Sequence, residues 1–359
     1  MRTRDHLFVS ILSLCLSASS LTPAALAAEP SETGNAAKME SAGTVENAAV
    51  SATSPQAPAV QTMKRPRVAL ALGGGGTRGA AHVGVLKVLT EAGIPIDCIV
   101  GTSMGAIVGG LYSAGVPLDD LMTRFEDGRL MKTFMTVPLS VRVVVAPIMV
   151  LPRAFGHHPY DGLYKGNKFR KYLNNSVSEY ERKIEELKIP FRAVVLNLVD
   201  GKPYALSEGN LGYALQASSA VPGLRKPVQI GDNLYVDGGV VANVPVSFAK
   251  ELNPDIIIAV DVDERFDKVP LKTFTKIGSV SERVVTLQLA NIDKQQCKDA
   301  DILIHPNVDG IGLISTSKKE ARQALEAGQK AAQEALPAIK AKLAEFGITA
   351  AVPSANETK

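Results

Sequence analysis

A serine lies between a strand pattern and a helix pattern in the first third of this 359-residue chain. The pentapeptide Gly101-Thr102-Ser103-Met104-Gly105 follows the apolar run 96–100 and leads into the helix-like stretch 106–114. A G-x-S-x-G sequence at a strand-to-helix turn is the pattern of a nucleophile elbow, in which glycines permit a strained backbone that projects the serine hydroxyl. The helix that follows points its N-terminal amides at the same place. This feature requires a sheet with a helix packed on it, and it predicts Ser103 as a nucleophile.

A second glycine-rich turn lies one strand and one helix upstream. Residues 73–79 follow the strand-like run 67–72, and consecutive glycines let backbone N–H groups converge on an anion. One use is phosphate binding, because the turn contains a G-x-G-x-x-G fingerprint after a strand. The other is an oxyanion hole for an ester attacked by Ser103. A β-α-β unit places both turns side by side, so the oxyanion interpretation uses both motifs, whereas a nucleotide site leaves the serine idle.

A serine nucleophile needs a base within hydrogen-bonding reach. The best carboxylate is Asp237, where the strand-like run 233–236 ends in Asp-Gly-Gly. An alternative is a Ser-His-Asp esterase that uses His305, since Ser103, Asp237 and His305 follow the chain order of the α/β-hydrolase triad. That order of motifs fits less well, because the glycine turn precedes the serine by only one β-α unit.

Three stretches together resemble the bacterial branch of the patatin-like phospholipase family. Gly74-Gly75-Gly76-Thr77-Arg78-Gly79 is similar to the family's G-G-G-x-[RK]-G loop. Gly101-Thr102-Ser103-Met104-Gly105 is similar to its G-x-S-x-G elbow, and Asp237-Gly238-Gly239 to its D-G-[GA] box. The resemblance extends over residues 67–346, and Gly73 departs from it by standing where the family often has aspartate.

The resemblance implies a catalytic dyad without histidine, with Ser103 as the nucleophile and Asp237 as the base. Its elbow glycines would be Gly101 and Gly105. Its oxyanion hole would be formed by Gly74, Gly75, Gly76 and Arg78. The implied fold is a three-layer α/β/α arrangement around a mostly parallel sheet. The implied activity is that of a serine lipid acyl hydrolase, of phospholipase A or lysophospholipase type, which acts on phospholipids or other acyl lipids without a metal.

The pattern along the chain predicts four segments. Residues 1–27 have the basic start, short apolar run and Ala-Leu-Ala cleavage pattern of a signal peptide, which predicts export to the periplasm or beyond. Residues 28–63 are rich in Ala, Ser, Thr and Pro and predict a disordered tether. Residues 64–346 alternate strand-like and helix-like runs, as a catalytic α/β domain requires. Residues 347–359 are expected to form a flexible tail.

Composition excludes several classes of function. The net charge of +3 and the lack of a basic-aromatic stripe give no case for nucleic acid. Three cysteines and five histidines provide no metal-ligand pattern. Cys98 and Cys297 are expected to be separate thiols, and the acidic residues of 261–267 to form a solvated loop.

The segment 130–160 is apolar but too short and interrupted to span a bilayer. Two interpretations remain open for it. It is either part of the core or an apolar flap beside the active site, which would make peripheral contact with lipid through its cationic neighbours.

Overall fold

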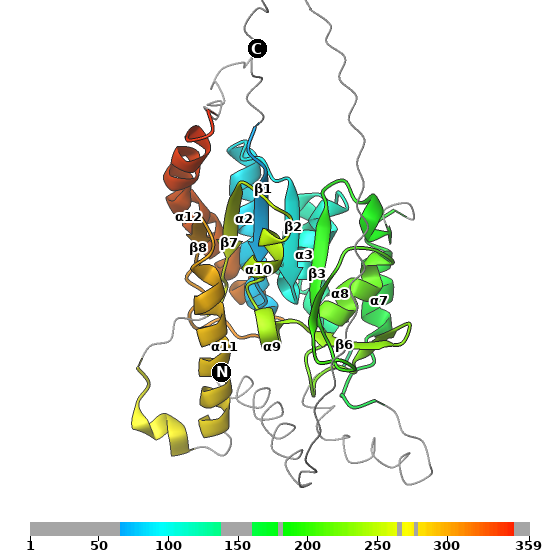
Figure 1. Ribbon diagram of the computed structural model, residues 1–359. Helices are drawn as coiled ribbons and strands as arrows, with labels where there is room; N and C mark the ends of the chain where they lie inside the picture. The colour runs from blue at the N-terminus through cyan, green and yellow to red at the C-terminus, as the bar shows by residue number, and fades with distance from the viewer. Residues whose placement is uncertain (1–64, 138–159, 179–181, 264–267, 276–278, 348–359) are drawn as a thin grey trace, which may run out of the picture.

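A mixed sheet forms the centre of the protein (Figure 1). The computed structural model describes residues 65–137, 160–178, 182–263, 268–275 and 279–347. The strands are β1 (Val68–Leu72), β2 (Cys98–Thr102), β3 (Phe191–Asn197), β4 (Pro203–Leu206), β5 (Val228–Ile230), β6 (Asn233–Asp237), β7 (Ile256–Val260) and β8 (Ile302–Ile304). The α-helices are α2 (Ala80–Glu91), α3 (Met104–Ser113), α4 (Leu118–Glu126), α5 (Arg129–Phe134), α7 (Asn167–Asn174), α8 (Leu211–Ser218), α9 (Gly239–Ala242), α10 (Val246–Lys250), α11 (Ser279–Cys297) and α12 (Lys318–Ala344). Short 3-10 helices are η1 (Gly76–Gly79), η3 (Ile184–Glu186) and η4 (Leu271–Thr275).

The strands run in the order β5-β6-β3-β2-β1-β7-β8, and β4 pairs with β3 outside this path. The five strands from β3 to β8 are parallel, as the alternation of strand and helix patterns predicts. At the other side, β4 and β6 pair antiparallel with β3, and β5 pairs antiparallel with β6. The sheet is therefore mostly parallel, with an antiparallel extension that carries the Asp-Gly-Gly turn.

Helices cover both faces of the sheet, which confirms the three-layer α/β/α prediction. Along β1, Val68, Leu70 and Leu72 face a large core with α2, α3 and α12, while Ala69 and Ala71 face a smaller core with the α9–α10 region. In Figure 1, α9 and α10 lie in front of the sheet and α2 and α3 behind it. This alternation is the two-residue period of a strand buried on both sides.

Several sequence predictions fall on residues that the structure does not describe. These are the signal segment 1–27, the tether 28–63, the tail after Gly347, and residues 138–159 of the segment for which a flap and a core position were left open. The start of that segment lies in α5 (Arg129–Phe134). Cys98 and Cys297 are both free thiols, as expected. Among the described helices, none has the length and apolar character needed to cross a membrane.

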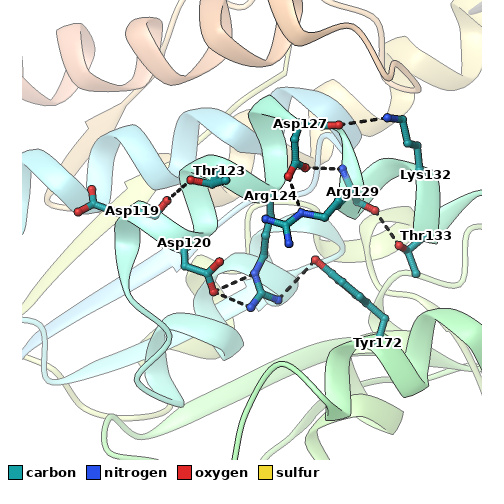
Figure 2. Close-up of polar contacts among 9 residues, drawn as sticks. All are labelled: Asp119, Asp120, Thr123, Arg124, Asp127, Arg129, Lys132, Thr133 and Tyr172. Carbon is teal, nitrogen blue, oxygen red and sulfur yellow. Dashed lines mark hydrogen bonds and ion pairs between the residues drawn. The ribbon is translucent and has the colours of Figure 1, made fainter.

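A polar network centred on the Arg124–Asp120 ion pair joins α4 to α7 (Figure 2). The Arg124 guanidinium donates to Asp120 at 2.6 Å from Nη2 and 3.1 Å from Nε. It also donates to the Tyr172 hydroxyl at 3.4 Å and lies 5.5 Å from the centroid of that ring. The hydrogen bond from Arg124 holds the pKa of Asp120 below its usual value. The network therefore fixes the relative position of two helices that lie far apart along the chain.

We expect Arg124→Ala to lower the free energy of unfolding by about 1–3 kcal/mol, because it leaves Asp120 and Tyr172 without their shared donor. Arg322→Ala is a matched control, since Arg322 also pairs with an acid on α4, Glu126, but at the surface. It should change stability by no more than about 0.5 kcal/mol. Urea unfolding midpoints of the two variants check this, and equal shifts would contradict the role given to the network.

Candidate active site

Ser103 occupies a strained turn between β2 and α3. Its backbone has φ 53° and ψ −117°, a conformation that costs roughly 1–3 kcal/mol in a residue other than glycine. The turn is closely packed at both glycines. A Cβ on Gly101 would lie 2.6 Å from the backbone of Ala106, and one on Gly105 would lie 2.3 Å from the carbonyl oxygen of Leu72. The geometry is that of a nucleophile elbow, and it needs glycine at both positions.

The register of the sheet brings Asp237 level with Ser103. Thr102 on β2 pairs with Val194 on β3, and the next residue of β3, Val195, pairs with Asp237 on β6. Because β6 runs antiparallel to β3, its last residue lies beside the turn that follows β2. The Ser103 side chain lies close enough to the Asp237 carboxyl to lower the pKa of that group. The structure thus brings together the two residues that the sequence analysis pairs.

The Asp237 carboxyl is buried, with 5% of the residue exposed. Its Oδ1 accepts a hydrogen bond of 2.8 Å from the amide of Gly239. Burial raises the pKa of Asp237 to about 6, although the hydrogen bonds from Ser103 and Gly239 act in the opposite direction. A carboxylate with a pKa just below neutrality is mostly ionised at pH 7 and still basic enough to accept a proton from a reacting hydroxyl.

The glycine turn lies against the elbow. A Cβ on Gly74 would be 3.2 Å from the Cβ of Ser103. The Gly74 amide donates to the backbone oxygen and to Oδ1 of Asn243, at 3.2 and 3.1 Å. Within the described part of the chain, the amides of Gly75 and Gly76 donate to no protein acceptor. Of the three glycines predicted for the oxyanion hole, these two therefore keep N–H groups available for an anion, while Gly74 positions the turn.

Arg78 and His82 hold the glycine turn from behind. The buried Arg78 donates from Nε to the carbonyl oxygen of Ile311 at 2.7 Å. His82 is fully buried, and its Nε2 lies 2.7 Å from the carbonyl oxygen of Gly73. Burial lowers the pKa of His82 to about 4, so at neutral pH the ring is neutral and Nε2–H donates to that carbonyl. Both contacts fix the backbone of the turn.

His305 does not join Ser103, so the alternative Ser-His-Asp triad is wrong. Its Nδ1 lies 3.1 Å from Asp261 Oδ2, and the residue follows β8. In the sheet, β1 and β7 separate β8 from β2. Three strand spacings correspond to about 14 Å, which is too far for direct proton transfer.

The sequence does not predict a polar network that lies behind the glycine turn, with Asp293 buried and Asn243 and Asp263 partly buried. Asn243 donates from Nδ2 to Asp263 at 2.9 Å and to Asp293 at 3.1 Å, and Asp293 also accepts from the amide of Val244 at 3.0 Å. Burial beside Asp261 and Asp293 raises the pKa of Asp263 to about 8, and burial raises that of Asp293 to about 6. Asp263 therefore keeps its proton near neutral pH, whereas Asp293 is mostly ionised there. Asp263 contacts Asn243 and is not part of the solvated loop that was expected.

This network was missed because its members are 20 and 50 residues from Asn243 in the chain. Aspartates so far apart form no local pattern.

Among the described residues, no group of three or more His, Cys, Asp or Glu side chains is arranged to hold a metal ion. The network connects α11 to the glycine turn through a single side chain, Asn243.

Asn243→Ala should lower kcat roughly 10- to 100-fold, since a small displacement of catalytic groups is enough for such a loss. Asn197→Ala is the matched control, because the buried Asn197 also makes a side-chain hydrogen bond, to Asn233 at 3.0 Å, but does not contact the glycine turn. Both variants should lose about 1–3 kcal/mol of stability. Steady-state hydrolysis and urea unfolding separate the effects, and an equal loss of kcat in the two variants would argue against a positioning role.

Comparison with known proteins identifies relatives over just over half of the chain. A Mycobacterium bovis protein described as an uncharacterized NTE family protein is 34% identical over 209 residues, which are 58% of this chain and 52% of the relative. The mouse patatin-like phospholipase domain-containing protein 6 is 29% identical over 209 residues, or 58% of this chain and 14% of the relative. Lysophospholipase NTE1 of Kluyveromyces lactis is 32% identical over 219 residues, or 59% and 14%. This chain thus spans about half or less of the length of these relatives.

The solved structures that match this chain share little sequence identity with it. VipD from Legionella pneumophila has a TM-score of 0.42 and 13% identity, over 77% of this chain and 67% of VipD. Human GIVD cytosolic phospholipase A2 has a TM-score of 0.43 and 12% identity, over 80% and 60%. The family model for patatin-like phospholipases matches residues 70–250, which include the glycine turn, the Ser103 elbow and Asp237. Since that match covers half of the chain, the protein belongs to the patatin-like phospholipase family.

Proposed function

We propose that the protein is a serine lipid acyl hydrolase that cleaves acyl esters of membrane lipids with a Ser103–Asp237 dyad. The observation that carries the proposal is the sheet register, which places a serine in a strained elbow beside a buried carboxyl group and close to two unpaired amides. Membership of the patatin-like phospholipase family supports a lipid ester hydrolase.

The proposed first half-reaction is acyl transfer to the enzyme. Ser103 Oγ attacks the ester carbonyl carbon while the Asp237 carboxylate accepts the hydroxyl proton. The carbonyl oxygen becomes an oxyanion, to which the amides of Gly75 and Gly76 donate. When this intermediate collapses, the bond to the alcohol breaks, the alcohol oxygen takes the proton from Asp237, and the acyl group remains on Ser103.

The proposed second half-reaction releases the fatty acid. A water molecule gives a proton to Asp237 and attacks the acyl-enzyme carbonyl, which again forms an oxyanion beside the glycine turn. The bond to Ser103 Oγ then breaks, and the proton on Asp237 returns to that oxygen. One ester and one water yield one acid and one alcohol, and the enzyme is restored.

Phospholipids and lysophospholipids are the proposed substrate class. One relative is described as a lysophospholipase and another as a patatin-like phospholipase domain-containing protein. The test is to incubate the protein with vesicles of phosphatidylglycerol and with lysophosphatidylcholine, and to measure free fatty acid by mass spectrometry. Fatty acid release is expected. No release, combined with nucleotide affinity that survives Ser103→Ala, would favour a nucleotide-binding role for the glycine turn.

A further inference from the structure

Large apolar side chains that face solvent are concentrated on one part of the molecule. Among the described residues, eleven large hydrophobic residues are exposed, and five of them lie between positions 269 and 287. These five are Val269, Leu271, Val280, Val284 and Leu287. We call them the α11 apolar face, since they lie on α11 and on the η4 region that precedes it. Such a concentration differs from the scattered single residues that are normal on a protein surface.

Along α11 the exposed residues form a stripe. Val280, Val284 and Leu287 are 58%, 48% and 39% exposed, and their spacing places them within about 60° around the helix. Asp293 and Gln296 project from the opposite side, where they bond Asn243 and the carbonyl oxygen of Val241. The second half of the helix thus contacts the rest of the protein with one side. The first half presents its apolar side chains on the opposite side.

The α11 apolar face lies at the catalytic end of the sheet. Asp293 bonds Asn243, which accepts a hydrogen bond from Gly74 of the glycine turn. In Figure 1, the first turns of α11 and the yellow η4 extend past the end of the sheet where α9 lies, and α9 follows Asp237 closely in the chain. The projecting end of α11 and the dyad therefore belong to the same edge of the molecule.

Positive charge accompanies the apolar side chains. Leu271, with 88% of its surface exposed, lies between the exposed residues Lys268 and Lys272. The described residues 268–275 contain these two lysines and no acidic residue. An apolar tip flanked by lysines is complementary to a membrane surface with anionic headgroups, because the apolar groups enter the headgroup boundary while the ammonium groups meet phosphates.

We propose that the α11 apolar face docks the protein onto an anionic phospholipid surface, with the Ser103 edge directed at the lipid. The proposal rests on the proposed function, because a lipid hydrolase has its substrate in such a surface. It places the membrane contact on the described residues 269–275 and 280–287, a different part of the chain from 130–160, for which the sequence left a lipid-contacting flap as one of two interpretations.

The test is cosedimentation with vesicles of equal parts phosphatidylglycerol and phosphatidylcholine, using the full chain. The double variant Leu271→Glu/Val284→Glu should bind at least about tenfold more weakly than wild type, and its hydrolysis of vesicle lipid should fall in parallel. Its hydrolysis of a soluble short-chain ester should stay within about twofold of wild type, which also shows that it is folded. Leu303→Glu is the matched control, as Leu303 on β8 is 45% exposed, and it should bind like wild type. Vesicles of phosphatidylcholine alone should bind wild type more weakly.

Three results would overturn the docking proposal. One is wild-type binding by the double variant, and another is equal weakening by Leu303→Glu. The third is a wild-type dimer in analytical ultracentrifugation that becomes a monomer in the double variant without loss of vesicle binding, which would make the face a contact between copies. In each case soluble-ester turnover still tests the Ser103–Asp237 dyad separately. If that turnover is absent while vesicle binding depends on the face, the proposed function fails and the docking surface stands.

Discussion

Ser103→Ala is expected to reduce ester hydrolysis at least about 10³-fold and to abolish covalent labelling by a fluorophosphonate. The hydroxyl is the only group of this side chain that can form the acyl bond, and the neighbouring Asp237 carboxylate would have no proton to accept. Intact mass after labelling gives the readout, with a single adduct on wild type and none on the variant. Ser113→Ala is the matched control, since Ser113 is buried on the same helix that follows the elbow. It should retain the adduct.

The strained backbone offers a second readout at the same position. Ser103→Gly removes the hydroxyl and also relieves the cost of φ 53°, because glycine adopts positive φ readily. It should be as inactive as Ser103→Ala but more stable than it by about 1 kcal/mol. Equal stability of the two variants would mean that the elbow stores no strain. A persistent adduct on Ser103→Ala would place the nucleophile elsewhere.

The parallel half of the fold and the two glycine turns were predictable from the sequence because local patterns determine them. Apolar runs such as 68–72 are buried on both faces, and glycines at 101 and 105 are needed wherever a strand turns directly into a helix through a serine. Side-by-side turns then follow from the short right-handed connection between parallel strands.

The rest of the site depends on contacts that local sequence does not encode. Asp237 lies level with Ser103 because β6 pairs antiparallel with β3, and only the register shows this. Gly74 stands among other glycines in the sequence, yet its amide donates a hydrogen bond to Asn243, 169 residues away. His305 has the chain order of a triad, but it follows β8, which is three strands from β2 in the sheet. In each case, the partner is decided by pairing in the sheet and by packing between helices.

Asp237→Asn should reduce hydrolysis by about 10³-fold or more, because an amide cannot accept the serine proton. Wild-type kcat/KM should fall as the pH drops below about 6, where the carboxylate becomes protonated, and be level above it. The residual activity of the variant should lack this step. The measurement is kcat/KM for a soluble ester between pH 4.5 and 8.5, and a wild-type profile without a step in this range would contradict Asp237 as the base.

The same substitution should stabilise the protein at neutral pH. The folded-state pKa of Asp237, about 6, exceeds its ordinary value of 3.8, so the folded protein holds the proton more tightly than the unfolded chain. The resulting stability is fully present below pH 3.8 and is lost as the pH rises through 6, a change of about 3 kcal/mol for roughly two pKa units. Asparagine carries no charge at any pH and can still accept the Gly239 amide. The variant should therefore match wild type near pH 4 and exceed it by up to about 3 kcal/mol at pH 8, in urea unfolding at both pH values. A loss of activity together with this gain in stability indicates a charge maintained for catalysis, whereas a parallel loss of both would make Asp237 a structural residue.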